Sequence, residues 1–349
     1  MQSSSEHANV GKVLGLGVAL AALVSVILLA FLWPAVTAEA KNLPLALAGP
    51  QAQTSQIEAS ITGDSADLFK ISTVENRDAA VDLIKSRQVY GAIVLAQKPE
   101  VLVSTAASAA VAAKLGGFAP VLQAQITKAM AAQGITPPAP ITVAVTDVVP
   151  LSSNDSSGAI ISASAFPLVI GGVIGGVIIT LLIGGVWRRL FALLVLAVVA
   201  GFAIAGILQG WFGGLQGEYW MNVSAISLAV FAIGGVVVGL GSLIGRGGLA
   251  LGAVFFILFA NPLAATAVPK EFIVAPWGEV GQWMPPGAAG TLLRDLSYFP
   301  NADALMPWLV LAGWALLGLV LITIAATFHR APKAQASNAD VVQESVTAS

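Results

Sequence analysis

The sequence contains no cysteine, and this absence excludes disulfide bonds, thiolate metal sites and a cysteine nucleophile. It also contains no GxxxxGK[ST] motif, so the chain has no P-loop with which to bind ATP. Charge is scarce as well: 10% of the residues are charged and the formal net charge is -2, which gives no basic surface for nucleic acid. We therefore expect no nucleic-acid partner and no cofactor site.

What the sequence does contain is hydrophobic residues, which make up 57% of the chain and give a mean hydropathy of +0.86. A soluble domain usually carries about 25% charged residues, so this chain is predicted to be a polytopic α-helical membrane protein. A helix needs about 20 apolar residues to cross about 30 Å of hydrocarbon. Six stretches meet this requirement: Val13–Trp33, Phe166–Val186, Leu190–Leu208, Ala225–Ile244, Leu249–Val268 and Leu305–Phe328.

None of the six predicted spans contains Asp, Glu, Lys, Arg or His. Transporters driven by protons or ions usually place such a group inside the membrane, so a self-powered secondary transporter is not favoured. The first span could also be a signal peptide, because Lys12 precedes it and the small-residue stretch VTAEA follows it. Its length favours a retained membrane anchor over a cleaved peptide.

Basic residues predict the orientation, because Lys and Arg in short loops are retained in the cytoplasm. Both termini are therefore predicted to be cytoplasmic in a bacterial plasma membrane, and residues 39–165 to be outside. Six basic residues lie on the predicted cytoplasmic side: Lys12, Arg188, Arg189, Arg246, Arg330 and Lys333. Only two, Lys270 and Arg294, lie near the membrane on the predicted outer side.

The predicted order along the chain is a single anchor followed by an inserted domain and a helical block, a 1+5 arrangement. A cytoplasmic tail, 1–12, precedes the anchor, 13–33. An extracytoplasmic α/β domain, 39–165, is inserted before the five-helix domain, 166–328, and a disordered cytoplasmic tail, 329–349, ends the chain.

Histidine chemistry is not expected. The two histidines, His7 and His329, lie in the predicted cytoplasmic flanks, so neither can join the outer domain in a triad or a metal site. We expect no enzyme.

In the inserted domain, stretches with the sequence pattern of β-strands alternate with stretches typical of helices. LPLALAG (43–49), LFKISTV (68–74), AIVLA (92–96) and VLVSTA (101–106) are typical of strands, and ITVAVTDVVPL (141–151) of a last strand. Asn76 is a good N-cap for the helix that precedes AIVLA. Residues 107–133 are predicted to be helical, with a break near Gly116 and Gly117. One compact α/β core is expected.

The second predicted span carries GGVIGG, which places Gly171 with Gly175 and Gly172 with Gly176 in two overlapping GxxxG pairs. Small residues at this spacing let helices approach closely in lipid. The pattern predicts a helix-packing face, used either between two copies of the chain or within one copy.

Two further groups are candidates for contacts. Trp187, Arg188 and Arg189 form the predicted turn between the second and third spans, as a positive-inside anchor or as a contact for a cytoplasmic partner. Asn261 and Pro262 are expected to kink the fifth predicted span, either as part of a substrate path or as a simple kink.

Residues 277–299 form an amphipathic outer segment before the last span. Trp277, Trp283, Tyr298 and Phe299 suit the headgroup level of a bilayer. The stretch GAAGTLLRDL is predicted to form a short helix that lies in the outer leaflet or dips into it.

The whole pattern resembles the ABC-2-type exporter permeases and the related YhgE/Pip membrane family. The likeness is carried by LPLALAG, AAVDLIKSRQVYGAIVLAQ and VLVSTAASAAVAAKL in the outer domain. In the membrane half it is carried by TDVVPL, FPLVIGGVIGG and QWMPPGAAGTLLRDLSYFPNA. The resemblance implies an oligomeric permease that exports a hydrophobic or cell-envelope substrate, driven by a separate cytoplasmic ATPase.

One departure keeps a second interpretation open. Permeases that couple to an ATPase usually present a cytoplasmic helix between spans two and three, and this chain has only Trp-Arg-Arg there. The alternative is a non-transporting envelope scaffold or accessory subunit, whose outer domain binds a partner protein or lipid.

Overall fold

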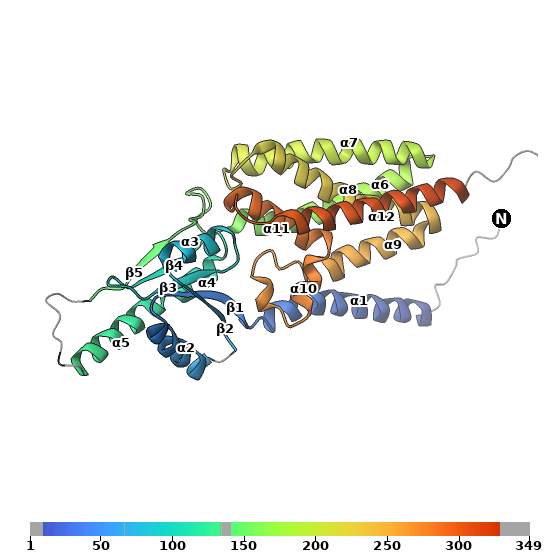
Figure 1. Ribbon diagram of the computed structural model, residues 1–349. Helices are drawn as coiled ribbons and strands as arrows, with labels where there is room; N and C mark the ends of the chain where they lie inside the picture. The colour runs from blue at the N-terminus through green and yellow to red at the C-terminus, as the bar shows by residue number, and fades with distance from the viewer. Residues whose placement is uncertain (1–9, 66, 133, 135–140, 329–349) are drawn as a thin grey trace, which may run out of the picture.

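The computed structural model describes residues 10–65, 67–132, 134 and 141–328. An α/β domain and a bundle of long helices lie end to end, with helices α10 (Trp277–Gln282) and α11 (Pro285–Tyr298) between them (Figure 1). The predictions for His7, His329, Arg330, Lys333 and the tail 329–349 fall outside the described residues, as does most of the N-terminal tail.

A five-stranded mixed sheet forms the α/β domain, with the strand order β2-β1-β3-β4-β5. Strand β1 lies parallel to both β2 and β3, whereas β3 and β4 are antiparallel and β4 and β5 are parallel. The strands span Leu43–Ala48, Phe69–Val74, Gly91–Val94, Glu100–Val103 and Ala144–Asp147. The five strand positions predicted from alternation are confirmed by this sheet.

The helices of this domain cover both faces of the sheet. They are α2 (Gln51–Ser65), α3 (Arg77–Lys85), α4 (Ala109–Gly116) and α5 (Phe118–Ala132). The side chain of Asn76 accepts a 2.9 Å hydrogen bond from the Ala79 amide, so the predicted N-cap is confirmed. The break predicted near Gly117 is present between α4 and α5.

Alternation along β1 divides the core between the two faces. Leu43, Leu45 and Leu47 are buried with residues of α4 and α5 on one face. Ala46 and Ala48 are buried with residues of α3 on the other face. Because successive side chains of a strand point to opposite sides, one strand supplies both halves of the core.

In the described residues, five helices are long and apolar enough to cross a membrane, which makes the chain an integral membrane protein. They are α1 (Val10–Val36), α6 (Ala159–Leu182), α7 (Val186–Ala205) with the π-helical turn η1 (Gly206–Trp211), α8 (Tyr219–Ile244) and α12 (Leu305–Phe328). Helix α6 begins seven residues before the predicted span at Phe166, so the α/β domain ends before Ala159 rather than at 165.

The predicted span Leu249–Val268 is helical only as far as Ala260. Helix α9 (Arg246–Val254) continues as the π-helical turn η2 (Phe255–Ala260), which gives a helix about 22 Å long at 1.5 Å per residue. This is shorter than the hydrocarbon core of about 30 Å. The helix ends before Pro262, which has no N–H to donate and whose ring crowds the preceding turn.

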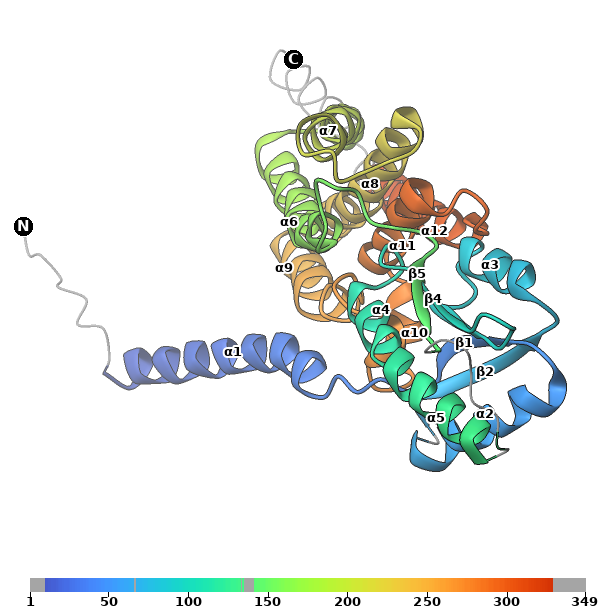
Figure 2. The ribbon, with the colours of Figure 1, turned by 90° about the vertical axis from the view of Figure 1, so that its left-hand side faces the viewer.

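Helix α8 lies at the centre of the bundle, with α6, α7 and α12 packed around it, and it is the most buried of the long helices. In contrast, none of the most apolar stretch of α1 is buried against the rest of the protein. Helix α1 stands apart from the other long helices in Figure 2. The ring of Phe31 of α1 contacts the ring of Phe166 of α6 edge to face. Lipid is the natural surrounding for such a helix.

Two of the four glycines of GGVIGG lie against α8 in the same chain. A Cβ atom built on Gly176 would lie 3.0 Å from Val237 Cβ and 3.1 Å from the Gly234 carbonyl oxygen. One on Gly172 would lie 2.9 Å from Ile233 Cγ2. Gly175 faces Leu196 of α7, and a Cβ on Gly171 would meet no atom within 4 Å. In the structure, the glycines other than Gly171 therefore pack against neighbouring helices of the same chain.

We expect Gly176→Leu to lower the thermal unfolding midpoint of the purified protein, because the larger side chain would push α6 away from α8. Overpacking of this kind costs about 1 to 3 kcal/mol. Gly171→Leu is the matched control, since it adds the same side chain on open space. Equal midpoints for the two variants, measured in detergent, would show that the α6–α8 contact does not limit stability.

Candidate functional site

The site lies where the α/β domain meets the helix bundle, and helix α11 (Pro285–Tyr298) forms its centre. Ten of the residues of α11 are buried, and the helix packs on α6, α8 and α12. The predicted amphipathic segment is thus largely enclosed by protein. Trp277 and Trp283 remain exposed, whereas Phe299 is only 1% exposed.

Phe299 is part of the core of the α/β domain, although it belongs to the membrane half of the sequence. It is buried with Ala80 and Ile84 of α3 and with Leu102 of β4. Burial of a phenylalanine side chain stabilises a structure by about 1.5 to 3 kcal/mol. The chain therefore closes one face of its sheet with a residue that lies more than 190 positions after β4.

The end of α3 provides an ion pair across the junction. Arg87 donates a 2.5 Å hydrogen bond to Asp295 Oδ1 on α11, and its guanidinium lies 5.8 Å from the centre of the Phe299 ring. Both side chains are largely shielded from solvent. Removal of one partner from a buried pair is strongly destabilising, because the remaining charge is then buried without compensation.

Arg87 occupies a backbone position that usually belongs to glycine. Its φ of 57° is left-handed, its N–H donates to the Ile84 carbonyl, and the N–H of Gln88 donates to the Leu83 carbonyl. These two bonds make a Schellman motif, whose left-handed residue is commonly Gly. A side chain other than glycine costs about 1 to 2 kcal/mol in this conformation. Arg87 holds this conformation while its side chain is paired with Asp295.

Asp295 is a charged group held in a nearly dry environment. Burial raises the pKa of this carboxyl above its usual range, while the charge and the hydrogen bond of Arg87 act in the opposite direction. Arg87 therefore limits the rise in the pKa of Asp295 that burial causes.

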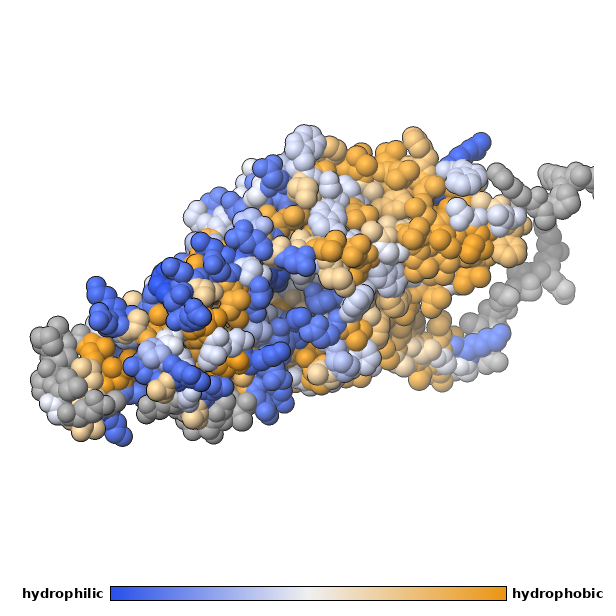
Figure 3. Space-filling model, viewed as in Figure 1, coloured by the Kyte–Doolittle hydropathy of each residue, from blue (hydrophilic) through white to orange (hydrophobic). Residues whose placement is uncertain are grey.

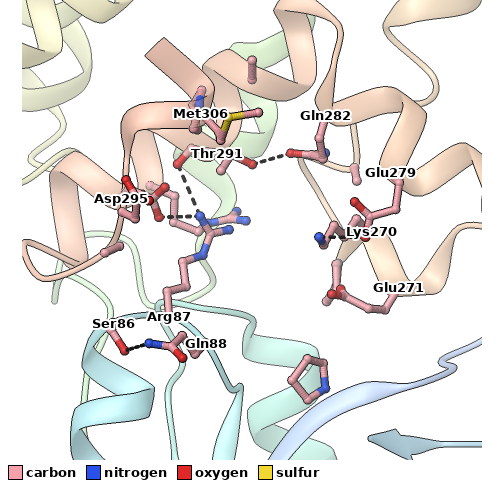
Figure 4. Close-up of a pocket in the computed structure, with 18 of the residues that line it drawn as sticks. Ser86, Arg87, Gln88, Lys270, Glu271, Glu279, Gln282, Thr291, Asp295 and Met306 are labelled. Atoms are coloured by element: carbon pink, nitrogen blue, oxygen red, sulfur yellow. Dashed lines mark hydrogen bonds and ion pairs between the residues drawn. The ribbon is translucent and has the colours of Figure 1, made fainter. Parts of the chain in front are cut away.

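A cavity of about 530 Å³ opens beside this ion pair (Figure 4). Its lining comes from the end of α3, the 3-10 turn η3 (Lys270–Phe272), α10 (Trp277–Gln282), α11 and the start of α12. Residues from both halves of the molecule are needed to form it. Its walls combine charged groups with apolar side chains such as Trp283, Met306 and Val310.

Most charged groups around the cavity have a partner. Lys270 and Glu279 form an ion pair at 2.8 Å, and Tyr90 donates a 2.8 Å hydrogen bond to Glu271 Oε2. Burial, with the nearby charge of Glu271, raises the pKa of Tyr90, so this hydroxyl keeps its proton and remains a donor. The backbone amides of Glu39 and Lys41 also donate to carbonyl groups of η3, at 3.1 and 3.3 Å.

Arg294 differs from these groups. It is half-buried, it lines the 530 Å³ cavity and a second cavity of about 280 Å³, and it donates to the Thr266 carbonyl oxygen at 3.1 Å. Among the described residues it forms no ion pair within 4 Å. Burial, together with the nearby charge of Arg87, lowers its pKa to about 10, which still leaves it charged near neutral pH.

The residues predicted as a substrate path lie away from both cavities. Asn261 follows the π-helical turn η2, and its backbone N–H donates to the Phe256 carbonyl oxygen at 3.0 Å. Neither Asn261 nor Pro262 lines a cavity described here, although Ala265 and Thr266 of the same loop lie close to Arg294 or the cavity wall. In the structure these two residues mark the end of a short helix.

Trp187, Arg188 and Arg189 are not the turn between α6 and α7, which corrects the prediction. The turn consists of Ile183 to Gly185, where Gly185 has a positive φ of 85°, and the three residues belong to the first turn of α7. Arg189 donates to the Ile183 carbonyl at 2.8 Å and to Ser242 Oγ at 2.9 Å. Trp187 and Arg188 are exposed.

Metal ligation finds no support in the described ranges, which contain no group of three or more Asp, Glu, His or Cys residues that could hold an ion. Comparison of the chain with protein-family models, curated proteins and solved structures found no match. The resemblance to exporter permeases therefore depends on the sequence patterns alone.

We expect Arg87→Gly to lower the thermal unfolding midpoint, even though glycine removes the backbone strain at this position. The buried carboxylate of Asp295 loses its partner, and breaking a buried pair costs about 3 to 5 kcal/mol, more than the about 1 to 2 kcal/mol that relief of strain returns. A variant as stable as the parent would contradict the role given to the ion pair.

The difference in thermal unfolding midpoint between Arg87→Gly and the parent is expected to depend on pH. The pKa of Asp295 in the folded state lies above its unfolded value, and loss of Arg87 moves it further up. Protonation then favours the folded state, and this contribution is lost as the pH rises through the folded pKa. Unfolding midpoints measured from mildly acidic to neutral pH should therefore approach those of the parent at the acidic end, and a constant difference would contradict this.

Proposed function

We propose that the chain is a permease-like protein of the bacterial plasma membrane, which exports a hydrophobic or cell-envelope substrate with a separate ATPase as its partner. The supporting observation is the cavity between the α/β domain and α11. It lies where the hydrophilic surface of the domain meets the hydrophobic surface of the bundle (Figure 3). A membrane-embedded substrate could reach such a cavity from the side.

The walls of the cavity suit a molecule with a polar and an apolar end. Polar groups come from α3, η3 and α11, whereas Met306 and Val310 of α12 and the exposed Trp283 supply apolar surface. Binding sites of this mixed character are typical of small amphiphiles.

A partner is proposed because export needs a source of energy that the chain itself does not provide. The predicted spans carry no ionisable residue and the sequence has no P-loop, so the chain offers no group of its own for using an ion gradient or ATP. A driving force would have to enter through the bundle end that lies away from the α/β domain. Lys12, Arg188 and Arg246 lie in the segments at that end, which supports the orientation with both termini in the cytoplasm.

A non-transporting scaffold remains the second candidate, because that end of the bundle offers little surface. The connections there are the turn from Ile183 to Gly185 and the turn at Gly245. An ATPase would have to bind mainly to helix ends and to exposed side chains such as Trp187 and Arg188.

Orientation can be tested by cysteine labelling, which the absence of native cysteine makes simple. Ser153→Cys lies just before α6 and Gly184→Cys just after it, and both positions are exposed. On intact cells an impermeant reagent should label the first variant and leave the second unlabelled until the cells are opened. The reverse pattern would place the α/β domain in the cytoplasm.

The partner is tested by affinity purification in mild detergent. A nucleotide-binding subunit should copurify with the parent and be lost from Trp187→Ala with Arg188→Ala, which removes exposed contacts only. Arg189→Ala is a poor probe of binding, because it also breaks the bonds to Ile183 and Ser242. If the parent retains no such subunit, the scaffold becomes the better interpretation.

A further inference from the structure

Among the charged groups that line the junction in the described residues, one cation forms no ion pair within 4 Å. Arg87 is paired with Asp295 and Lys270 with Glu279. Arg294 has only the carbonyl oxygen of Thr266 among the described residues.

The other carboxylates that line the two cavities are already engaged. Glu271 accepts from Tyr90, and Asp303 accepts from the Leu305 amide at the start of α12. In the second cavity, Asp155 accepts from the amides of Ala159 and Ile160 at the start of α6. None of these acids forms an ion pair with Arg294 in the described part of the chain.

Burial disfavours the charged form of Arg294 and the nearby charge of Asp295 offsets this only in part, so a bound anion beside the guanidinium would lower the remaining cost. Arg294 lines both cavities, so an anion beside it would have open volume on two sides. A guanidinium presents its donors in a planar fork that matches two oxygens of a phosphate group. The local chemistry therefore favours an oxyanion.

The larger cavity also has a route toward lipid. Met306, in the first turn of α12, is 46% exposed, and Trp283, which also lines this cavity, is 61% exposed. Farther along α12, exposed Leu309 and Leu316 continue the apolar surface of the bundle. An acyl chain attached to a headgroup at Arg294 would find hydrocarbon-like surface in this direction.

We propose that the junction binds the phosphate headgroup of a membrane phospholipid, with Arg294 as the anion-binding residue and the acyl chains directed along α12. The inference rests on the proposed transport function, for which it names the substrate class. Binding itself requires no ATPase, so the two can fail separately.

The test measures binding of phosphatidylglycerol to the detergent-purified full chain, with diacylglycerol as the lipid that lacks phosphate. The parent should bind phosphatidylglycerol more tightly than diacylglycerol. Arg294→Gln should weaken phosphatidylglycerol binding about tenfold or more, as expected for the loss of charged hydrogen bonds. Arg246→Gln, which changes an exposed arginine at the other end of the bundle, is the matched control and should bind like the parent.

Arg294→Lys guards against a variant that does not fold, because it keeps the charge and should retain part of the affinity. Inorganic phosphate should compete with phosphatidylglycerol in the parent. Equal binding of the two lipids by the folded parent would overturn the proposal, as would undiminished phosphatidylglycerol binding by Arg294→Gln. Phosphate binding that needs Arg294, without phosphatidylglycerol binding, would also overturn it and assign the site to a soluble anion. Lipid binding without a copurifying ATPase would leave the site intact and remove the transport function.

Discussion

The ion pair between Arg87 and Asp295 is the interaction on which the arrangement of the two halves depends. It joins the end of α3 to α11 across 208 positions of sequence, and Arg87 opposes the rise in the pKa of Asp295 that burial causes. Phe299 follows on the same segment and completes the core of the α/β domain. The cavity lies beside this contact and takes its walls from both halves, so the site exists only while the junction is closed.

Local chemistry allowed much of the fold to be predicted. The strands followed from alternation, α3 from the cap at Asn76, and the long helices from runs of apolar residues. The prediction for Leu249–Val268 overestimated the helix, because hydropathy records that a stretch is apolar but not where its helix ends. Ala260 is followed by Asn261 and Pro262, and the apolar residues beyond them continue as an irregular segment, of which Leu263 and Ala264 are buried.

The site was much less accessible from sequence. From the sequence, Arg294 contributes only to the count of basic residues that predicts the orientation. Arg87 adopts a left-handed backbone angle typical of glycine, which no sequence pattern indicates. The one signal in the sequence is the adjacent pair Arg294 and Asp295 in an otherwise uncharged helix. Their separate roles, one paired and one unpaired, are set by Arg87, which lies in a different domain of the chain.

A double-mutant cycle between Arg87 and Asp295 tests the account most directly. Arg87→Gln keeps the left-handed residue non-glycine, and Asp295→Asn keeps the shape of the carboxyl, so the cycle isolates the charge pair from the backbone strain. We predict that the double variant loses less free energy of unfolding than the two single variants lose together, with a coupling free energy of about 1 kcal/mol or more. Additive losses of stability in the two single variants would show that the ion pair does not hold the halves together.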